Sequence, residues 1–119
     1  QAKTLQQQFL TQLHSLGGVT INGDIEHSLP NILNLSFDNV GSDTLLIALR
    51  DKLAISSSSA CNSGAIEASY VLRAMGIEGE RLYSAVRFSF GRYTTEDDIN
   101  RAAIIVSEEV RRLRLLAES

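Results

Sequence analysis

The chain contains a single thiol, Cys61, in a segment whose other residues are small and polar. The serine tract Ser56–Ser59 precedes it and Asn62–Gly64 follow it, which is typical of a loop. A thiol on a polar loop is available for reaction, and a helix expected to begin near Ile66 would add partial positive charge that favours the thiolate. Free cysteine is also among the most buried residue types, so an inert, packed thiol stays open on these residues alone.

Arg87 is the second residue whose position suggests chemistry. The segment Ala85–Phe90 alternates apolar and polar residues, which predicts a strand with one buried face, and Arg87 falls on the other face with Ser89. A guanidinium held rigidly on a strand can bind a carboxylate through two parallel hydrogen bonds. The alternative is an ordinary solvent-exposed arginine. Arg92 lies after the predicted strand and more simply pairs with the acidic start of the next helix.

The remaining titratable groups are weaker candidates. His14 is expected on a helix surface and His27 in a loop, and neither is close to Cys61 in sequence. One cysteine with two histidines is too little for a typical metal site, so none is predicted. Lys3 and Lys52 are expected on helical faces, and no glycine-rich phosphate loop is present.

Composition limits the class of protein. The chain has 119 residues, 44% hydrophobic and 21% charged, which is typical of one globular domain. Its 11 basic and 14 acidic residues leave a net charge of −3, which argues against nucleic-acid and anionic-membrane surfaces. One cysteine cannot form an internal disulfide, and no apolar run is long enough to span a membrane. We therefore expect a soluble, cytoplasmic domain, and its start within a helical pattern suggests a piece of a longer chain.

Periodicity predicts the elements that position Cys61 and Arg87. They are a helix ending at Gly17-Gly18, a short strand at Val19–Ile21, a strand through Leu33, Leu35 and Phe37, a helix beginning at Gly41-Ser42-Asp43, a helix over Ile66–Met75, the strand Ala85–Phe90 and a last helix. Thr94 or Thr95 is expected to cap the last helix, with acidic residues at its start and Arg111, Arg112 and Arg114 near its end. The pattern predicts an α+β domain with a small sheet of three or four strands, mostly antiparallel, and helices packed on it.

Two long segments, SSSSACNSGAIEASYVLRAMGI and AVRFSFGRYTTEDDINRA, resemble the C-terminal region of pyridoxal-phosphate-dependent cysteine desulfurases that supply sulfur for iron–sulfur clusters. The similarity extends to NGDIEHSLPNILNLSF and the helix after it, so it covers nearly the whole chain. It implies that residues 1–119 are the small domain of a fold-type I enzyme of the class-V aminotransferase family, with the cysteine loop at about 56–64. The large domain, with the cofactor lysine, is absent from this chain.

The resemblance also implies roles for two residues. Cys61 matches the catalytic cysteine, which takes sulfur from L-cysteine as a persulfide, releases L-alanine and passes the sulfur to an acceptor such as an iron–sulfur scaffold protein. Arg87 matches the arginine that binds the substrate carboxylate. The complete enzyme would hold pyridoxal 5'-phosphate and form a homodimer, whereas this fragment is expected to bind no cofactor and to be inactive. Ala68 stands where the family often has proline, which should affect the entry to the expected helix.

Three alternatives remain at this point. The chain could be a stand-alone carrier that accepts a persulfide made elsewhere on Cys61. It could be a structural domain in which Cys61 is inert and the surface serves dimer or partner contacts. It could also belong to a selenocysteine lyase, a near relative of the desulfurases.

Overall fold

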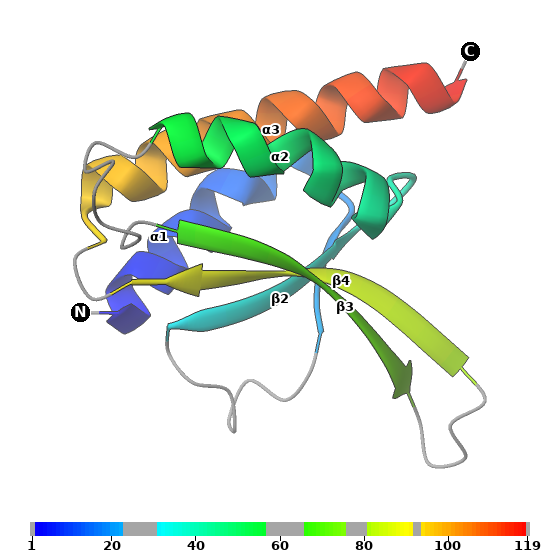
Figure 1. Cartoon of the computed structure of the whole chain (residues 1–119), viewed down its shortest axis with the longest axis horizontal. Coiled ribbons are helices and arrows are strands. Elements are labelled where there is room, and N and C mark those ends of the chain that lie inside the picture. Colours follow the sequence, from blue (N-terminus) through cyan, green and yellow to red (C-terminus); the bar gives the residue numbers. More distant parts are fainter. Residues whose placement is uncertain (1, 23–30, 57–65, 76–80, 92–93, 119) are drawn as a thin grey trace.

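The computed structural model describes residues 2–22, 31–56, 66–75, 81–91 and 94–118 (Figure 1). These residues form three α-helices, one 3-10 turn and four strands. In chain order the elements are α1 (Ala2–Leu13), η1 (His14–Leu16), β1 (Val19–Ile21), β2 (Ile32–Phe37), α2 (Ser42–Ser56), β3 (Ile66–Met75), β4 (Arg81–Phe90) and α3 (Glu96–Glu118).

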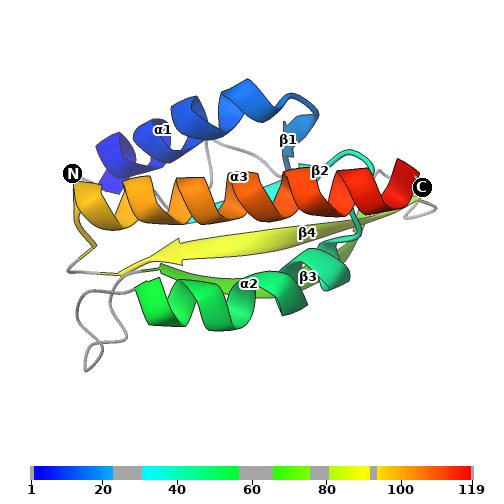
Figure 2. The ribbon, with the colours of Figure 1, turned by 90° about the horizontal axis from the view of Figure 1, so that it is seen from above.

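The four strands form one antiparallel sheet in the order β1-β2-β4-β3. The three helices lie over one face of it, with α3 between α1 and α2 (Figure 2). No helix from the described residues covers the opposite face (Figure 1). The prediction of an α+β domain with a small antiparallel sheet and helices packed on it is confirmed.

The core lies between the helices and the sheet, because alternation along β2 and β4 sends their apolar side chains to the same face. Leu33 of β2 stands opposite Phe88 of β4 in the register, and both are buried. Phe9 of α1 is fully buried and meets Phe88 edge-to-face, with ring centroids 5.2 Å apart. It also meets Phe90, at 5.8 Å. These aromatic contacts join α1 to the centre of the sheet.

The prediction of a helix over Ile66–Met75 is wrong, because this segment is the strand β3. It pairs with β4 along its whole length, from Ile66 opposite Phe90 to Met75 opposite Arg81. The physical reason is that β4 pairs with β2 on one side only, and alternate backbone groups of β4 need partners on the other side. The segment contains Tyr70 and Val71, which are typical of strands, and a short apolar run does not distinguish the two structures.

The last helix begins as predicted, with Thr95 as its cap. The Thr95 hydroxyl accepts from the Asp98 backbone N–H at 3.1 Å, and the Asp98 carboxylate accepts from the Thr95 N–H at 2.9 Å. This reciprocal pair satisfies two N–H groups that the first turn leaves without helical partners. The prediction for the other end differs, because α3 continues to Glu118 and its last turn has no basic residue. Arg112 and Arg114 lie before that turn and bind other groups.

Candidate functional site

The structure describes Arg87 but not the segment that contains the thiol. Cys61 lies outside the described residues, between the end of α2 at Ser56 and the start of β3 at Ile66. The predictions for His27 and Arg92 also fall outside the described residues. His14 is exposed in η1, as its surface interpretation predicts.

Arg87 lies on β4, which is an inner strand between β2 and β3. Its neighbours Val86 and Phe88 are fully buried against the helices, so the Arg87 side chain points to the opposite face, where it is exposed. The prediction of an arginine opposite a packed face is thus confirmed. Pairing on both sides and two buried neighbours fix the backbone at this position.

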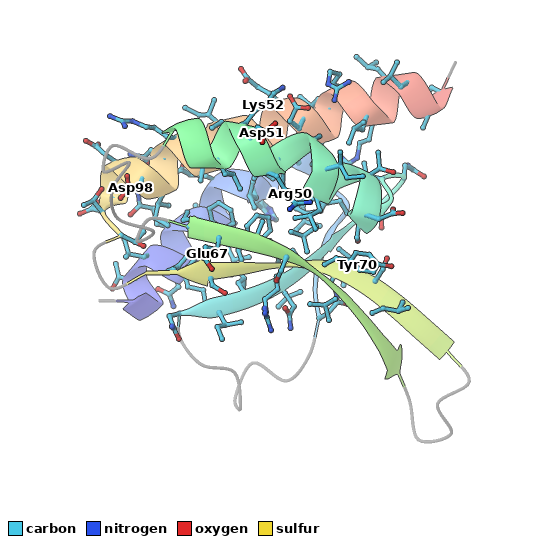
Figure 3. All side chains as sticks on the ribbon, viewed as in Figure 1. Arg50, Asp51, Lys52, Glu67, Tyr70 and Asp98 are labelled. Carbon is cyan, nitrogen blue, oxygen red and sulfur yellow. The ribbon has the colours of Figure 1, made fainter. Side chains whose placement is uncertain are left out.

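We call the face without helices the open face. Its described side chains alternate with those of the core and belong to Thr20, Ile32, Asn34, Ser36, Glu67, Ser69, Val71, Ala85, Arg87 and Ser89. Asn34 of β2 and Ser69 of β3 stand directly beside Arg87. Glu67 of β3, labelled in Figure 3, is the diagonal neighbour. Arg87 forms no ion pair or hydrogen bond with any residue in the described ranges, so its side-chain donors remain available for a ligand.

A polar group that the sequence reasoning missed lies beside Arg87. Asn34 Oδ1 is buried and has no hydrogen-bond partner within the described structure. The neighbouring amide of Asn22 donates to Ser36 Oγ at 2.6 Å, and that hydroxyl donates to the Ser84 carbonyl at 2.5 Å. The polar positions 34 and 36, alternating with Leu33 and its apolar neighbours, were the signal available in the sequence. Only the strand register shows that Asn34 is beside Arg87.

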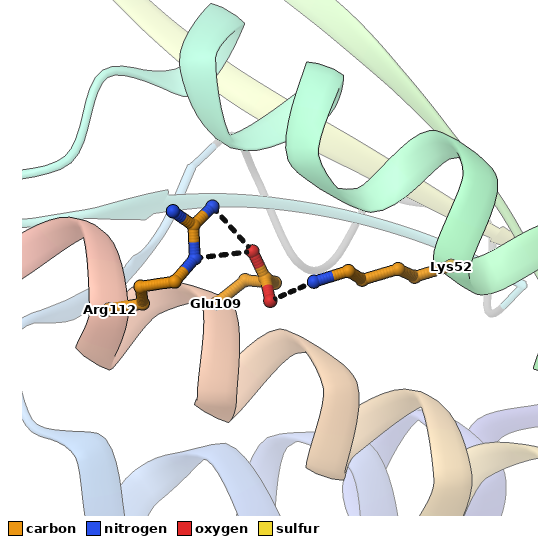
Figure 4. Close-up of polar contacts among 3 residues, drawn as sticks. All are labelled: Lys52, Glu109 and Arg112. Carbon is orange, nitrogen blue, oxygen red and sulfur yellow. Dashed lines mark hydrogen bonds and ion pairs between the residues drawn. The ribbon is translucent and has the colours of Figure 1, made fainter.

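A second charged cluster lies between α2 and α3 (Figure 4). Glu109 is buried, and its carboxylate binds Lys52 Nζ at 2.5 Å and Arg112 Nη2 at 2.8 Å. The hydrogen bond from Lys52 lowers the pKa of Glu109, burial opposes this by raising it, and Arg112 lowers it further. Lys52 is therefore committed to an ion pair that ties two helices together, and this cluster is structural.

Other kinds of site find little support in the described ranges. No three histidine, cysteine, aspartate or glutamate side chains there are grouped so that they could hold a metal ion. No described helix is both long and apolar enough to cross a membrane. A groove of about 320 Å³ runs between α1 and α3, lined mostly by polar residues that include Gln12, Ser107 and Arg111. It lies on the helix side of the sheet, away from Arg87.

The chain is similar to known proteins over most of its length. A family model for class-V aminotransferases matches residues 1–102. Relatives called cysteine desulfurase IscS, from Escherichia coli O9:H4 (strain HS), Escherichia coli (strain K12 / DH10B) and Shigella boydii serotype 18, are each 50% identical over 99 residues. The match covers 83% of this chain and 24% of each relative, so the chain spans about a quarter of their length. The chain belongs to the aminotransferase class-V family.

Proposed function

We propose that residues 1–119 are the small domain of a cysteine desulfurase, which converts L-cysteine to L-alanine and retains the sulfur as a persulfide on Cys61. The observation that carries the proposal is Arg87, an exposed arginine on an inner strand with no ion pair among the described residues. The chain that contains Arg87 is 50% identical, over 99 residues, to relatives called cysteine desulfurase IscS. The rest of the enzyme would lie outside this sequence, because the match covers 24% of those relatives.

Arg87 would hold the substrate by its α-carboxylate. A guanidinium presents parallel N–H groups at the spacing of two carboxylate oxygens, so the pair fixes orientation as well as position. The buried neighbours Val86 and Phe88 prevent the backbone from moving with the ligand. The substrate is thereby oriented by one end while its thiol, at the other end, reacts.

Cys61 would act as the nucleophile. Its thiolate attacks the sulfur of L-cysteine, so the new S–S bond forms as the bond between sulfur and Cβ breaks. Cβ gains the electron pair of that bond and a proton, which gives the methyl group of L-alanine, and Cys61 is left as a persulfide. The sulfur atoms are oxidised and the carbon is reduced, so no external oxidant is needed. The thiolate then has to reach an acceptor, which favours a loop for Cys61.

Pyridoxal 5'-phosphate is the cofactor that the family resemblance implies, and the described residues do not fit it. The cofactor is bound through a lysine amine. Lys52, the lysine whose side chain the structure describes, is paired with Glu109 on the helix side of the sheet, whereas Arg87 lies on the open face. We therefore place the cofactor in the part of the enzyme outside this chain and expect residues 1–119 alone to bind none and to be inactive.

The persulfide sulfur would pass to a thiol of an acceptor protein, such as an iron–sulfur scaffold. Thiol exchange of this kind requires reduced cysteines, which the cytoplasm maintains, so we place the enzyme there.

The resemblance is the basis for expecting a homodimer of the complete enzyme. The open face, with its exposed arginine, is the surface that would meet the cofactor-bearing part of the protein.

The test uses the full-length protein that contains this sequence. L-cysteine should yield L-alanine in the unchanged enzyme, and Cys61→Ser should abolish this release because serine cannot hold a persulfide. Survival of L-alanine release in Cys61→Ser would overturn the proposal. A stand-alone persulfide carrier would show no L-alanine release at all, and a selenocysteine lyase would turn over selenocysteine but not L-cysteine. Either result would also contradict the proposal.

A further inference from the structure

The unpartnered amide oxygen of Asn34 is the polar feature of the open face that the proposed function does not yet use. Asn34 Oδ1 is buried, yet it accepts no hydrogen bond within the described residues. Buried acceptors in folded proteins almost always have a donor, because losing water without a replacement is costly. The position of this oxygen therefore points to a donor that engages it in another state of the protein.

The strand register identifies Arg87 as the nearest strand partner of Asn34. The Phe90 N–H donates to the Asn31 carbonyl at 2.8 Å, so positions 31 and 90 form a hydrogen-bonded pair of the antiparallel ladder. Such pairs alternate with non-hydrogen-bonded ones, which places Asn34 and Arg87 in a pair of the second kind. Their Cα atoms are then about 4.5 Å apart and their side chains lie close together on the open face.

On the other side of Asn34, the side chains of Asn22 and Ser36 already donate to other groups. Asn22 Nδ2 donates to Ser36 Oγ, and Ser36 Oγ donates to the Ser84 carbonyl. Arg87, in contrast, has five N–H donors, no acceptor atom and no partner among the described residues. A carboxylate bound in the bidentate manner uses only two of these donors, so others remain for a second acceptor.

We propose that Asn34 is a positioning residue for Arg87. Asn34 Oδ1 accepts one guanidinium N–H and sets the plane of the group, while two other N–H donors bind the substrate carboxylate. This inference rests on the proposed function, because it assumes that Arg87 binds that carboxylate. A neutral amide suits the role, since it orients the guanidinium without cancelling the charge that attracts the substrate. An aspartate at position 34 would compete with the substrate for Arg87.

The experiment compares KM and kcat for L-cysteine in the full-length enzyme. Asn34→Leu removes the acceptor at similar volume, and we expect KM to rise about 10- to 50-fold, the lower part of the range for one hydrogen bond to a charged group, with kcat within about twofold. Asn34→Asp should raise KM at least as much. The matched control is Ser69→Ala, which changes the other neighbour of Arg87 and should leave KM unchanged.

A double-mutant cycle tests whether Asn34 acts through Arg87. We expect Arg87→Gln alone to lower kcat/KM about 100-fold, and Asn34→Leu to have no further effect in that background. If the effects of the two substitutions on kcat/KM multiply, or if KM is unchanged in Asn34→Leu, the positioning role is overturned while the function of Arg87 stays intact. An unchanged kcat/KM in Arg87→Gln would instead overturn the role of Arg87 itself. If Asn34→Leu does not fold, Asn34→Ala, which also removes the acceptor without adding a charge, carries the same comparison.

Discussion

The carboxylate of Glu109 on α3 lies 2.5 Å from Nζ of Lys52 on α2, and this ion pair joins two helices that pack on the same face of the sheet (Figure 4). Arg112, one turn further along α3, binds the other oxygen of the same carboxylate. Glu109 is only 5% exposed, whereas about half of each cation's side chain remains in water. Because this carboxylate is buried, loss of one of its cationic partners should lower the free energy of unfolding.

Removing Lys52 should destabilise the domain in a pH-dependent way. The folded state lowers the pKa of Glu109 below its ordinary value of 4.5, so the stabilisation is present above that pH. It is lost as the pH falls through the lower folded pKa. We expect Lys52→Met to cost about 1–2 kcal/mol at pH 7, less than a fully buried pair because the cations are half exposed. The free energies of unfolding of the unchanged chain and of Lys52→Met, measured with denaturant at pH 7 and pH 3, test this expectation.

The pH dependence distinguishes the ion pair from simple packing. The difference between the unchanged chain and Lys52→Met should shrink at pH 3, because below pH 4.5 the unfolded state takes up a proton that the ion pair resists in the folded state. The control is Arg50→Met, because Arg50 is exposed on the same helix. A difference of equal size at both pH values would mean that Lys52 acts through the packing of its aliphatic chain.

Arg114 ties α3 to two turns, one between η1 and β1 and the other directly after β2. Its guanidinium donates to the carbonyls of Leu16, Gly17 and Asp38 at 2.9–3.1 Å. The backbone at Gly18 has a φ of +66°, and an added Cβ there would approach Arg114 Nη2 to 2.9 Å. The close approach of the guanidinium to this turn therefore depends on glycine.

We expect Arg114→Ala to lower the free energy of unfolding by about 2–3 kcal/mol, because four carbonyls, that of Gly18 included, lose a charged donor. Arg114→Lys should recover only part of this, since a single ammonium cannot reach carbonyls on two separate turns. Arg111→Ala, an exposed position on the same helix, is the control and should change stability by less than about 0.5 kcal/mol. Equal losses at 111 and 114 would contradict the specific role of Arg114.

The assignment of β3 as an edge strand can be tested with proline. Positions 31 and 90 form a hydrogen-bonded pair of β2 and β4, so the backbone groups of Ser89 point the other way, towards Glu67 of β3. The N–H of Ala68 then points outward from the sheet. Glu67→Pro should remove a ladder hydrogen bond and destabilise the domain, whereas Ala68→Pro should be tolerated.

The helix that periodicity predicted over Ile66–Met75 would respond differently. Both positions would fall in its first turn, where proline is tolerated. Thermal unfolding of Glu67→Pro and Ala68→Pro therefore separates the two structures. Equal midpoints would contradict the strand, and a midpoint lower by several degrees in Glu67→Pro alone would support it.

Local pattern was sufficient for the elements that have one continuous buried face. Leu33 and Leu35 alternate cleanly in β2, and the apolar stripe of α3 repeats over several turns, so both were predicted correctly. The pattern over Ile66–Met75 was ambiguous because the strand is determined by pairing with β4, a contact between distant parts of the chain. Intrinsic preference is weak compared with such pairing.

In the candidate site, too, local pattern predicted one feature and pairing between distant strands determined another. Arg87 was placed correctly on the exposed face because its own neighbours alternate with it. Asn34 was missed because its relation to Arg87 depends on the register of β2 against β4, across more than fifty residues of sequence. Nothing local in the sequence specifies that register. The prediction that Cys61 is the nucleophile stays a prediction, since its segment lies outside the described residues.

The proposed role of Arg87 depends on the fork of its guanidinium as well as on its charge. Arg87→Lys keeps the positive charge but replaces two parallel donors with one compact ammonium. In the full-length enzyme we expect KM for L-cysteine to rise about 10-fold, as for loss of one charged hydrogen bond. Arg50→Lys, an exposed arginine in the helix layer, is the matched control and should leave KM unchanged. Wild-type KM in Arg87→Lys would show that charge alone suffices, and bidentate recognition would then be wrong.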